Sequence, residues 1–423
     1  MSRRLVALTP FLLALAGSCE RTRGEAMDPA GQDAGADSPA DGTDGATIDL
    51  AGKSFDVQLI GECLGPCGPV TLHVAGASPT TLSIVWSSSG RAAVGELARE
   101  GAKWKLTSPI QLEALPKGWN MCPGHRDLAT ATLELSDHDT DGVVELSGVA
   151  TLSRTECSDD TGEITLTADV ALAGEIDDTA PSAQVSSAGG LNPLGVVVSE
   201  ALQPTATATL SVPGAPHALS PILAAGYVVG FRSDLVLPLG AQLSLLVNGS
   251  DLAGVGKPAP LVVTTPPDFG VLTQDGFEGG SSQGMLGGAQ LVDGFAGEPA
   301  ITGTKMLYLA PGASALLRLQ RVSSEGNIAM ETRIVSACSN FAGSIYVAAG
   351  VIGGAQRQQA SFTTSELSPL PADAGAMQIG KQAGVLVPIP EAGKDVLLHV
   401  SGDYYEGSGC AKVGVLIDDL RLE

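Results

Sequence analysis

Residues 128–152 read LATATLELSDHDTDGVVELSGVATL, two runs of alternating apolar and polar residues on either side of an Asp-rich turn. Alternation with a period of two places every second side chain on the same face of a β-strand. Asp and Gly between residues 137 and 142 favour a reversal of the chain. The stretch therefore predicts a β-hairpin with one buried face.

The rest of the chain repeats this pattern. The whole chain has 423 residues, and its 54 glycines and 26 prolines separate short runs rich in Val, Thr, Ser and Leu. Such punctuation predicts an all-β fold, and the length suggests about three domains of roughly 100 to 200 residues each. The formal net charge of −23 argues against nucleic acid as a partner.

Residues 51–177 form the first expected domain, a β-sandwich. Within it, residues 91–101 leave a choice between a helix and a hairpin, because Gly95 lies in the middle of the run. The expected strands are Phe55–Ile60, Val70–Ala75, Thr81–Trp86, Lys103–Leu106, Leu128–Leu135, Val143–Leu152 and Glu163–Leu172.

The N-terminal residues 1–18 have the pattern of an export signal: two arginines, a largely apolar run and small residues before Cys19. The end of this run resembles the lipobox of bacterial lipoproteins. The resemblance implies a signal peptide over 1–18, a lipid on Cys19 that attaches the protein to a membrane, and a place in the bacterial cell envelope, facing the periplasm or the exterior. The alternative is an ordinary secretory signal with a chance cysteine. Residues 19–50 lack large apolar side chains and predict a disordered acidic tether.

Residues 178–267 resemble the bacterial Ig-like domain of surface-layer and other exported proteins. The resemblance implies a central Ig-like β-sandwich that acts as a spacer or display module, with no catalytic residues. It departs at Val255, where the family has Asn. The motifs that carry it are Asp178, Thr179 and Pro181 at the entry, VSE at Val198 to Glu200, and DLAG at Asp251 to Gly254.

Residues 268–423 open with DGFEGG at 275–280 and close with VLIDDLRLE at 415–423. These ends resemble the terminal strands of jelly-roll domains of the galactose-binding and carbohydrate-binding type. The resemblance implies a C-terminal jelly roll, with a structural calcium beside its paired termini. Glu278 and Asp419 are the positions that match the acidic ligands.

Apart from Cys19, the chain has six cysteines, and each expected domain contains an even number of them: four, none and two. In an oxidising compartment, even numbers in each domain predict disulfide bonds. In an unbulged hairpin centred on residues 137–142, Cys122 faces Cys157. The other expected pairs are Cys63 with Cys67 and Cys338 with Cys410. The rival interpretation is a zinc site in which Cys63, Cys67, Cys122 and His125 are the ligands.

The Asp-rich turn makes calcium a candidate cofactor, and no cofactor is established by sequence. Asp137, Asp139 and Asp141 alternate before Gly142, the spacing with which carboxylates converge on a calcium ion. Gly148 stands where an EF-hand needs its bidentate Glu, so a complete EF-hand is excluded. An ordinary Asp-rich turn is the alternative.

No catalytic set converges in the sequence, and we expect no enzyme. Ser282 fits a G-x-S-x-G pattern, but no strand and helix flank it. Tyr404 and Tyr405, in the loop DYYEGSG, are the expected ligand-binding residues, with packing over the end of the sandwich as the alternative.

The sequence as a whole predicts a lipid-anchored envelope protein with a non-catalytic display, adhesion or binding role. A carbohydrate-binding accessory, or part of an extracellular hydrolase system, is the alternative. The partners would be the membrane and a glycan or envelope polymer, and the oligomeric state stays open.

Overall fold

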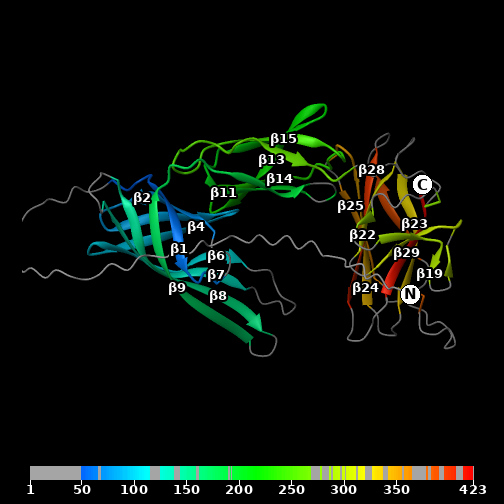
Figure 1. The fold of residues 1–423 in the computed structure, drawn as a ribbon, viewed down its shortest axis with the longest axis horizontal. Coiled ribbons are helices and arrows are strands. Elements are labelled where there is room, and N and C mark those ends of the chain that lie inside the picture. Colours follow the sequence, from blue (N-terminus) through cyan, green and yellow to red (C-terminus); the bar gives the residue numbers. More distant parts are fainter. Residues whose placement is uncertain are drawn as a thin grey trace, which may run out of the picture. The chain divides into compact units, whose positions relative to one another are not determined.

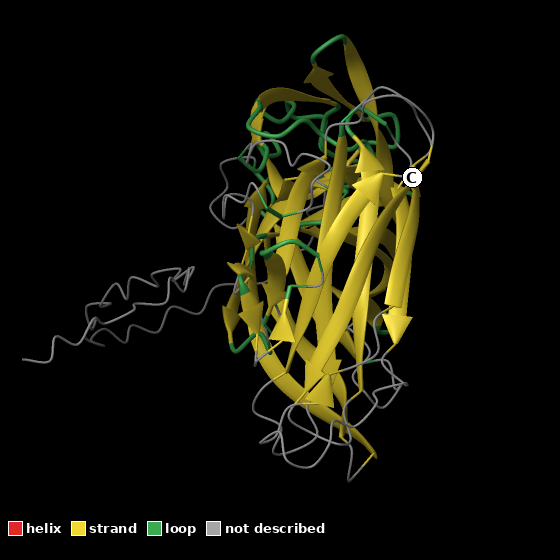
Figure 2. Cartoon of the chain, turned by 90° about the vertical axis from the view of Figure 1, so that its right-hand side faces the viewer, coloured by secondary structure: helices red, strands yellow, loops and turns green. Residues whose placement is uncertain are grey.

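The computed structural model describes residues 49–422 with gaps, and the described residues form only strands and loops (Figure 2). The all-β prediction is confirmed. No helix long and apolar enough to cross a membrane occurs among the described residues. The predicted signal peptide and Cys19 lie outside them, as does the predicted tether up to residue 48. Its last residue, Leu50, is instead buried in the core of the first unit, because its apolar side chain packs there. The gaps are 65–67, 115–123, 138–142, 159–161, 189–190, 192, 268–276, 279–284, 287–288, 296–297, 301, 311–312, 320–325, 337–341, 355–356, 364–377, 380–382, 390–394 and 406–412.

The first unit is one sheet that closes on itself (Figure 1). Neighbouring strands pair in the order β5-β4-β3-β2-β1-β9-β8-β7-β6, and β5 also pairs with β7. Closure removes the open edges that two facing sheets would leave, so a closed sheet takes the place of the expected sandwich. Its strands are β1 (Ser54–Gly61), β2 (Val70–Ala77), β3 (Thr81–Ser88), β4 (Arg91–Glu100), β5 (Lys103–Leu106), β6 (Ile110–Ala114), β7 (His125–Ser136), β8 (Glu145–Ser158) and β9 (Gly162–Ile176).

Residues 91–100 form strand β4, which excludes the helix that the sequence left open. β4 pairs with β3 on one side and β5 on the other, and these ladders override the helical propensity of the segment. Position 95 of this strand needs glycine, because a Cβ there would clash with Cδ1 of Ile110 and lie 2.8 Å from its Cγ1. The glycine therefore allows β6, a strand that the sequence did not predict, to approach β4.

The hairpin of β7 and β8 is confirmed, but its expected register is wrong. Ser136 pairs with Glu145, two positions beyond the partner that symmetry about residues 137–142 requires. A β-bulge between Leu128 and Thr130 then shifts the register by one residue. The shorter turn assumed from sequence and the unseen bulge explain the error.

The second unit has the strand order of a constant-type Ig sandwich. One sheet runs β10-β11-β14-β13, and the other runs β13-β12-β15-β16, with β13 shared between them. Inward residues of both sheets, such as Val196, Phe231, Leu210 and Leu245, form its core. The strands are β10 (Ala183–Ala188), β11 (Leu194–Leu202), β12 (Thr207–Val212), β13 (Ala215–Ala224), β14 (Tyr227–Ser233), β15 (Gln242–Asn248) and β16 (Leu261–Thr264).

The third unit is an antiparallel β-sandwich, consistent with the expected jelly roll. One sheet runs β17-β22-β28-β24-β25 and the other β18-β21-β29-β23-β26, with β27 also on β23. Side chains such as Leu317, Val347 and Val400 pack against Leu307 and Ile417 between the sheets. The strands are β17 (Met285–Leu286), β18 (Ala289–Val292), β19 (Gly294–Phe295), β20 (Glu298–Pro299), β21 (Met306–Leu309), β22 (Ser314–Leu319), β23 (Gly326–Ser336), β24 (Ala342–Val351), β25 (Arg357–Thr363), β26 (Gln378–Ile379), β27 (Ala383–Ile389), β28 (Val396–Tyr405) and β29 (Val413–Leu422).

Candidate functional site

Several predicted site residues fall outside the described part of the chain. Asp139 and Asp141 are among them, and Asp137 directly follows β7, so the calcium loop stays a prediction. Cys63 is buried and takes part in a disulfide. The three predicted pairings remain predictions. Cys67, Cys122, Cys338 and Cys410 lie outside the described residues, and the side chain of Cys157 is not described.

The carboxylate of Glu278 accepts hydrogen bonds from the loop that precedes β21. Its Oε1 accepts hydrogen bonds from the backbone N–H groups of Thr304 at 2.7 Å and Lys305 at 2.8 Å. Its Oε2 accepts a third from the Thr304 hydroxyl at 2.7 Å. These hydrogen bonds lower the pKa of Glu278, and the bond from the Thr304 hydroxyl has the largest effect. Gly303 has φ +60°, and a Cβ there would clash with the carboxylate, so glycine lets the loop wrap around it.

Asp418, rather than Asp419, is the buried carboxylate that meets the same loop. It accepts hydrogen bonds from the backbone N–H of Thr302 at 2.7 Å and from its hydroxyl at 3.2 Å. Asp419 follows with φ +49°. The structure thus brings Glu278 and Asp418 to residues 302–305, and a calcium ion held by Glu278 and Asp419 remains a prediction.

Tyr404 and Tyr405 lie in a strand and not in the predicted loop. They are the last two residues of β28, at the positions paired with Gly343 and Ala342 of β24. The pairing of β28 with β24 continues through all ten residues of each strand, which explains why these tyrosines stay extended. Their side chains lie outside the described part.

A different tyrosine is exposed on the same sheet. Tyr346 of β24 is 46% exposed, whereas its neighbour Val347 is buried between the sheets. Because successive side chains of a strand alternate between faces, Tyr346 projects from the outer face of the sheet. Among the described side chains of this face, Tyr346 is the one exposed aromatic residue.

Polar side chains lie to one side of Tyr346 on this outer face, on β28 and β22 (Figure 1 shows β22, β24, β25 and β28 in one sheet). Ser401 of β28 pairs with Tyr346, and Ser314 of β22 pairs with Ser401. His399 lies two residues from Ser401, hence on the same face, and burial lowers its pKa below the usual value. We call Tyr346, Ser401, Ser314 and His399 the Tyr346 face.

One end of this outer face is covered. Leu316 and Leu397 project from it and pack against Val236 in an apolar cluster. The backbone of Val236 also exchanges hydrogen bonds with Gly353 and Gly354, at 2.8 Å and 2.9 Å. The Tyr346 face therefore lies beside a covered patch, with Tyr346 exposed and its three polar side chains partly exposed.

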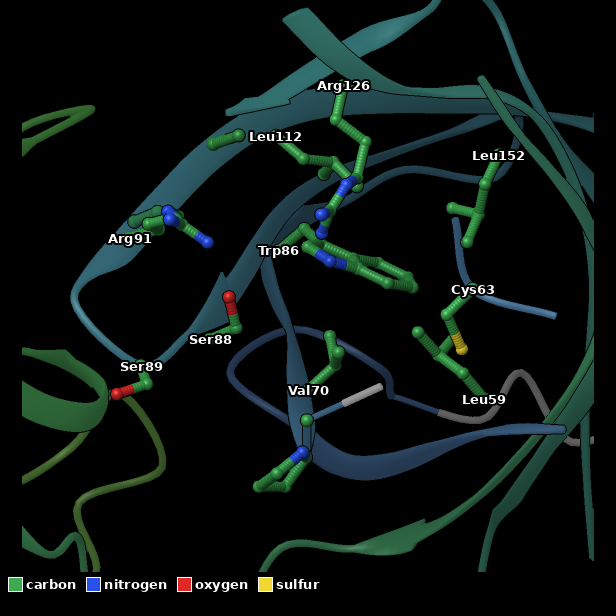
Figure 3. A pocket seen from close by; sticks show the side chains of 14 residues that line it. Leu59, Cys63, Val70, Trp86, Ser88, Ser89, Arg91, Leu112, Arg126 and Leu152 are labelled. Atoms are coloured by element: carbon green, nitrogen blue, oxygen red, sulfur yellow. The ribbon is translucent and has the colours of Figure 1, made fainter. Parts of the chain in front are cut away.

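A pocket opens in the closed sheet of the first unit (Figure 3). Trp86, Leu59 and Leu152 contribute apolar surface, and Arg91 and Arg126 contribute positive charge. Its volume of about 180 Å³ is below the roughly 300 to 1,000 Å³ of typical small-molecule sites. We therefore base no function on this pocket.

Comparisons with known proteins give no family. No family model matches the chain, and no curated protein matches it. Among solved structures, the carbohydrate-binding module TmCBM61 in complex with β-1,4-galactotriose is 14% identical, with a TM-score of 0.24, over 36% of this chain and 96% of that chain. The non-crystalline cellulose-specific module CBM28 is 12% identical, with a TM-score of 0.24, over 37% and 96%.

A third solved structure shares a longer stretch. The Cry4Aa toxin of Bacillus thuringiensis is 9% identical, with a TM-score of 0.20, over 86% of this chain and 51% of that chain. These identities and TM-scores are too low to indicate a shared function.

Proposed function

We propose that this protein is a non-catalytic glycan-binding protein, held at the bacterial envelope by a lipid on Cys19, and that the Tyr346 face contacts the glycan. The observation that carries the proposal is the exposed ring of Tyr346 with Ser401 and Ser314 in the same row of the sheet. This face favours glycan binding over a pure display role.

The chemistry of the face suits a sugar ring. A sugar presents an apolar C–H surface that stacks on an aromatic ring, and a rim of hydroxyl groups that need hydrogen-bond partners. Tyr346 supplies the ring, and the hydroxyls of Ser401 and Ser314 both donate and accept. His399 adds a ring nitrogen in the next row, and its lowered pKa keeps it neutral at pH 7.

The face is held rigid from behind. Val347 and Val400, which flank Tyr346 and Ser401 in sequence, are buried in the core of the sandwich. A site built on packed strands loses little conformational entropy when it binds. The lipid anchor and the absence of catalysis rest on the sequence: the signal before Cys19, and the lack of a nucleophile with a matching base.

A glycan array probed with the mature protein tests this proposal. We expect binding to one class of oligosaccharide, with the signal lost in Tyr346→Ala and largely kept in Tyr346→Phe, which retains the ring. Val262→Ala, at another exposed strand position, is the matched control and should bind like the wild type. Equal binding by Tyr346→Ala and the wild type, with both folded by circular dichroism, would overturn the proposal.

A further inference from the structure

Three acidic side chains meet in the interior near the start of the second unit. Asp177 directly follows β9, Glu200 lies in β11, and Asp251 follows β15 in an isolated bridge with Leu202. Their exposed fractions are 3%, 7% and 0%. One carboxylate oxygen from each lies within 4.8 Å of the other two. We call these residues the acidic triad.

Hydrogen bonds from the protein orient each carboxylate. Oδ1 of Asp177 accepts from the N–H of Thr179 at 3.2 Å, and Oδ1 of Asp251 accepts from the N–H of Val255 at 2.8 Å. Oε2 of Glu200 accepts from the hydroxyl of Thr71 at 3.3 Å. Local loops therefore fix the directions of the two aspartates, and strand β2 fixes that of Glu200.

Two oxygens of the triad have no hydrogen-bond donor. They are Oδ2 of Asp177 and Oδ2 of Asp251, and both are buried. A buried carboxylate oxygen without a donor is costly, so each such group needs a partner. No ion pair in the described part of the chain includes a member of the triad.

The neighbouring charged groups increase the need of the triad for a positively charged partner. Asp56 is the further carboxylate that acts on the triad, and it raises the pKa values of Asp177, Glu200 and Asp251. Asp178 in turn acts on Asp56. Every charged group identified around the triad is therefore negative, and like charges in a low-dielectric interior repel strongly.

Protons or a cation can neutralise such a group. Burial, the largest cause, and the neighbouring carboxylates raise the pKa of Glu200 to about 8 and that of Asp177 to about 6. A single proton gives one O–H donor, which cannot serve both Oδ2 atoms. A divalent cation contacts all three carboxylates at once.

We propose that Asp177, Glu200 and Asp251 bind a calcium ion. Carboxylate oxygens are hard ligands, and Ca²⁺ accepts six to eight oxygens in flexible geometry, the remainder coming from backbone carbonyls and water. The three ligands come from three separate segments of the chain. The ion therefore ties the connection before β10, the strand β11 and the loop after β15 together.

Calorimetric titration of the EDTA-treated mature protein with CaCl₂ at pH 8 tests the proposal. Comparison with Glu200→Gln and Asp251→Asn isolates the triad. We expect each substitution to weaken one binding event at least tenfold and to remove the matching rise in Tm. Asp139→Asn and Glu278→Gln are matched controls for calcium at the other acidic positions, and they should leave that event unchanged.

Both substitutions remove buried negative charge, so the variants should stay folded and a lost calcium response can be assigned to the triad. Glu200→Gln should fold, with a calcium-free Tm at or above that of the wild type. A calcium response that is the same in wild type, Glu200→Gln and Asp251→Asn would overturn the proposal. So would the absence of any response to millimolar Ca²⁺, which would mean that protons alone neutralise the triad. Binding of MgCl₂ as tight as CaCl₂ would contradict the assignment to calcium.

Discussion

The hydroxyl of Thr71 in β2 donates a hydrogen bond of 3.3 Å to Oε2 of Glu200 in β11. The bond joins a strand of the closed sheet to the strand that carries one member of the acidic triad, and it lowers the pKa of Glu200 against the stronger effect of burial. A side chain 129 positions earlier in the sequence thus helps to keep this carboxylate ionised.

Replacement of Thr71 by Val should raise the pKa of Glu200 further, because the hydrogen bond favours its ionised form. At pH 7 fewer molecules then hold Glu200 ionised, and we expect the calcium affinity to fall about threefold to tenfold, the effect of one hydrogen bond. Titrations at pH 7 and pH 9 measure the change, which should be smaller at pH 9. Thr71→Ser keeps the hydroxyl and should behave like the wild type.

Stability without calcium should depend on pH in a defined direction. Burial raises the pKa of Glu200 to about 8 and that of Asp177 to about 6, so the folded state holds protons that the unfolded state has already lost. The free energy of unfolding therefore falls as the pH rises from about 4.5 to about 8. Urea unfolding in EDTA at several pH values measures this slope.

Glu200→Gln and saturating calcium should each reduce that slope, since the first removes the titrating group and the second stabilises its ionised form. A slope in EDTA that is equal in wild type and Glu200→Gln would show that Glu200 titrates normally.

Gly95→Ala should destabilise the first unit by about 2 kcal/mol, because the new Cβ would clash with Ile110 across the sheet. Gly76→Ala is the matched control: its nearest neighbour would lie at an ordinary 3.8 Å, and we expect little change. Chemical unfolding compares the two. Adding Ile110→Val, which removes the clashing Cδ1, should restore part of the loss; no recovery would point to a cause other than this contact.

Asp395→Asn should destabilise the third unit by about 1–2 kcal/mol. Asp395 accepts hydrogen bonds from Nε and Nη2 of Arg318, at 2.8 Å and 2.6 Å, and both side chains are about three-quarters buried. The pair of Arg232 and Asp234 is more than half exposed, so Asp234→Asn should cost about 0.5 kcal/mol or less. Equal losses in urea unfolding would argue against burial as the deciding factor.

The strands were predictable because alternation is a local property. Lys103–Leu106 was expected as a strand with the bounds that β5 has. The register of β7 and β8 was not predictable, because it depends on the length of the turn and on a bulge, and neither leaves a clear pattern in the residues. The pairing of β5 with β7, which closes the first sheet, joins segments that no local pattern connects.

The acidic triad left one signal in the sequence. Val196, Val198 and Glu200 occupy successive inward positions of β11, so a charged residue stands where the alternation requires an apolar one. Asp177 and Asp251 have no such signal, since both lie in connections. Tyr346 lies in the run IYVAAGV, whose small residues suit either face of a strand, so its exposure emerges only from the packing of Val347.

Calorimetric titration of the mature protein with the best oligosaccharide from the array measures whether the Tyr346 face binds a glycan. We predict that Tyr346→Ala weakens binding at least tenfold, about 1.4 kcal/mol or more, while Tyr346→Phe stays within about threefold of the wild type. Unchanged affinity in a folded Tyr346→Ala protein would show that the glycan does not bind at the Tyr346 face.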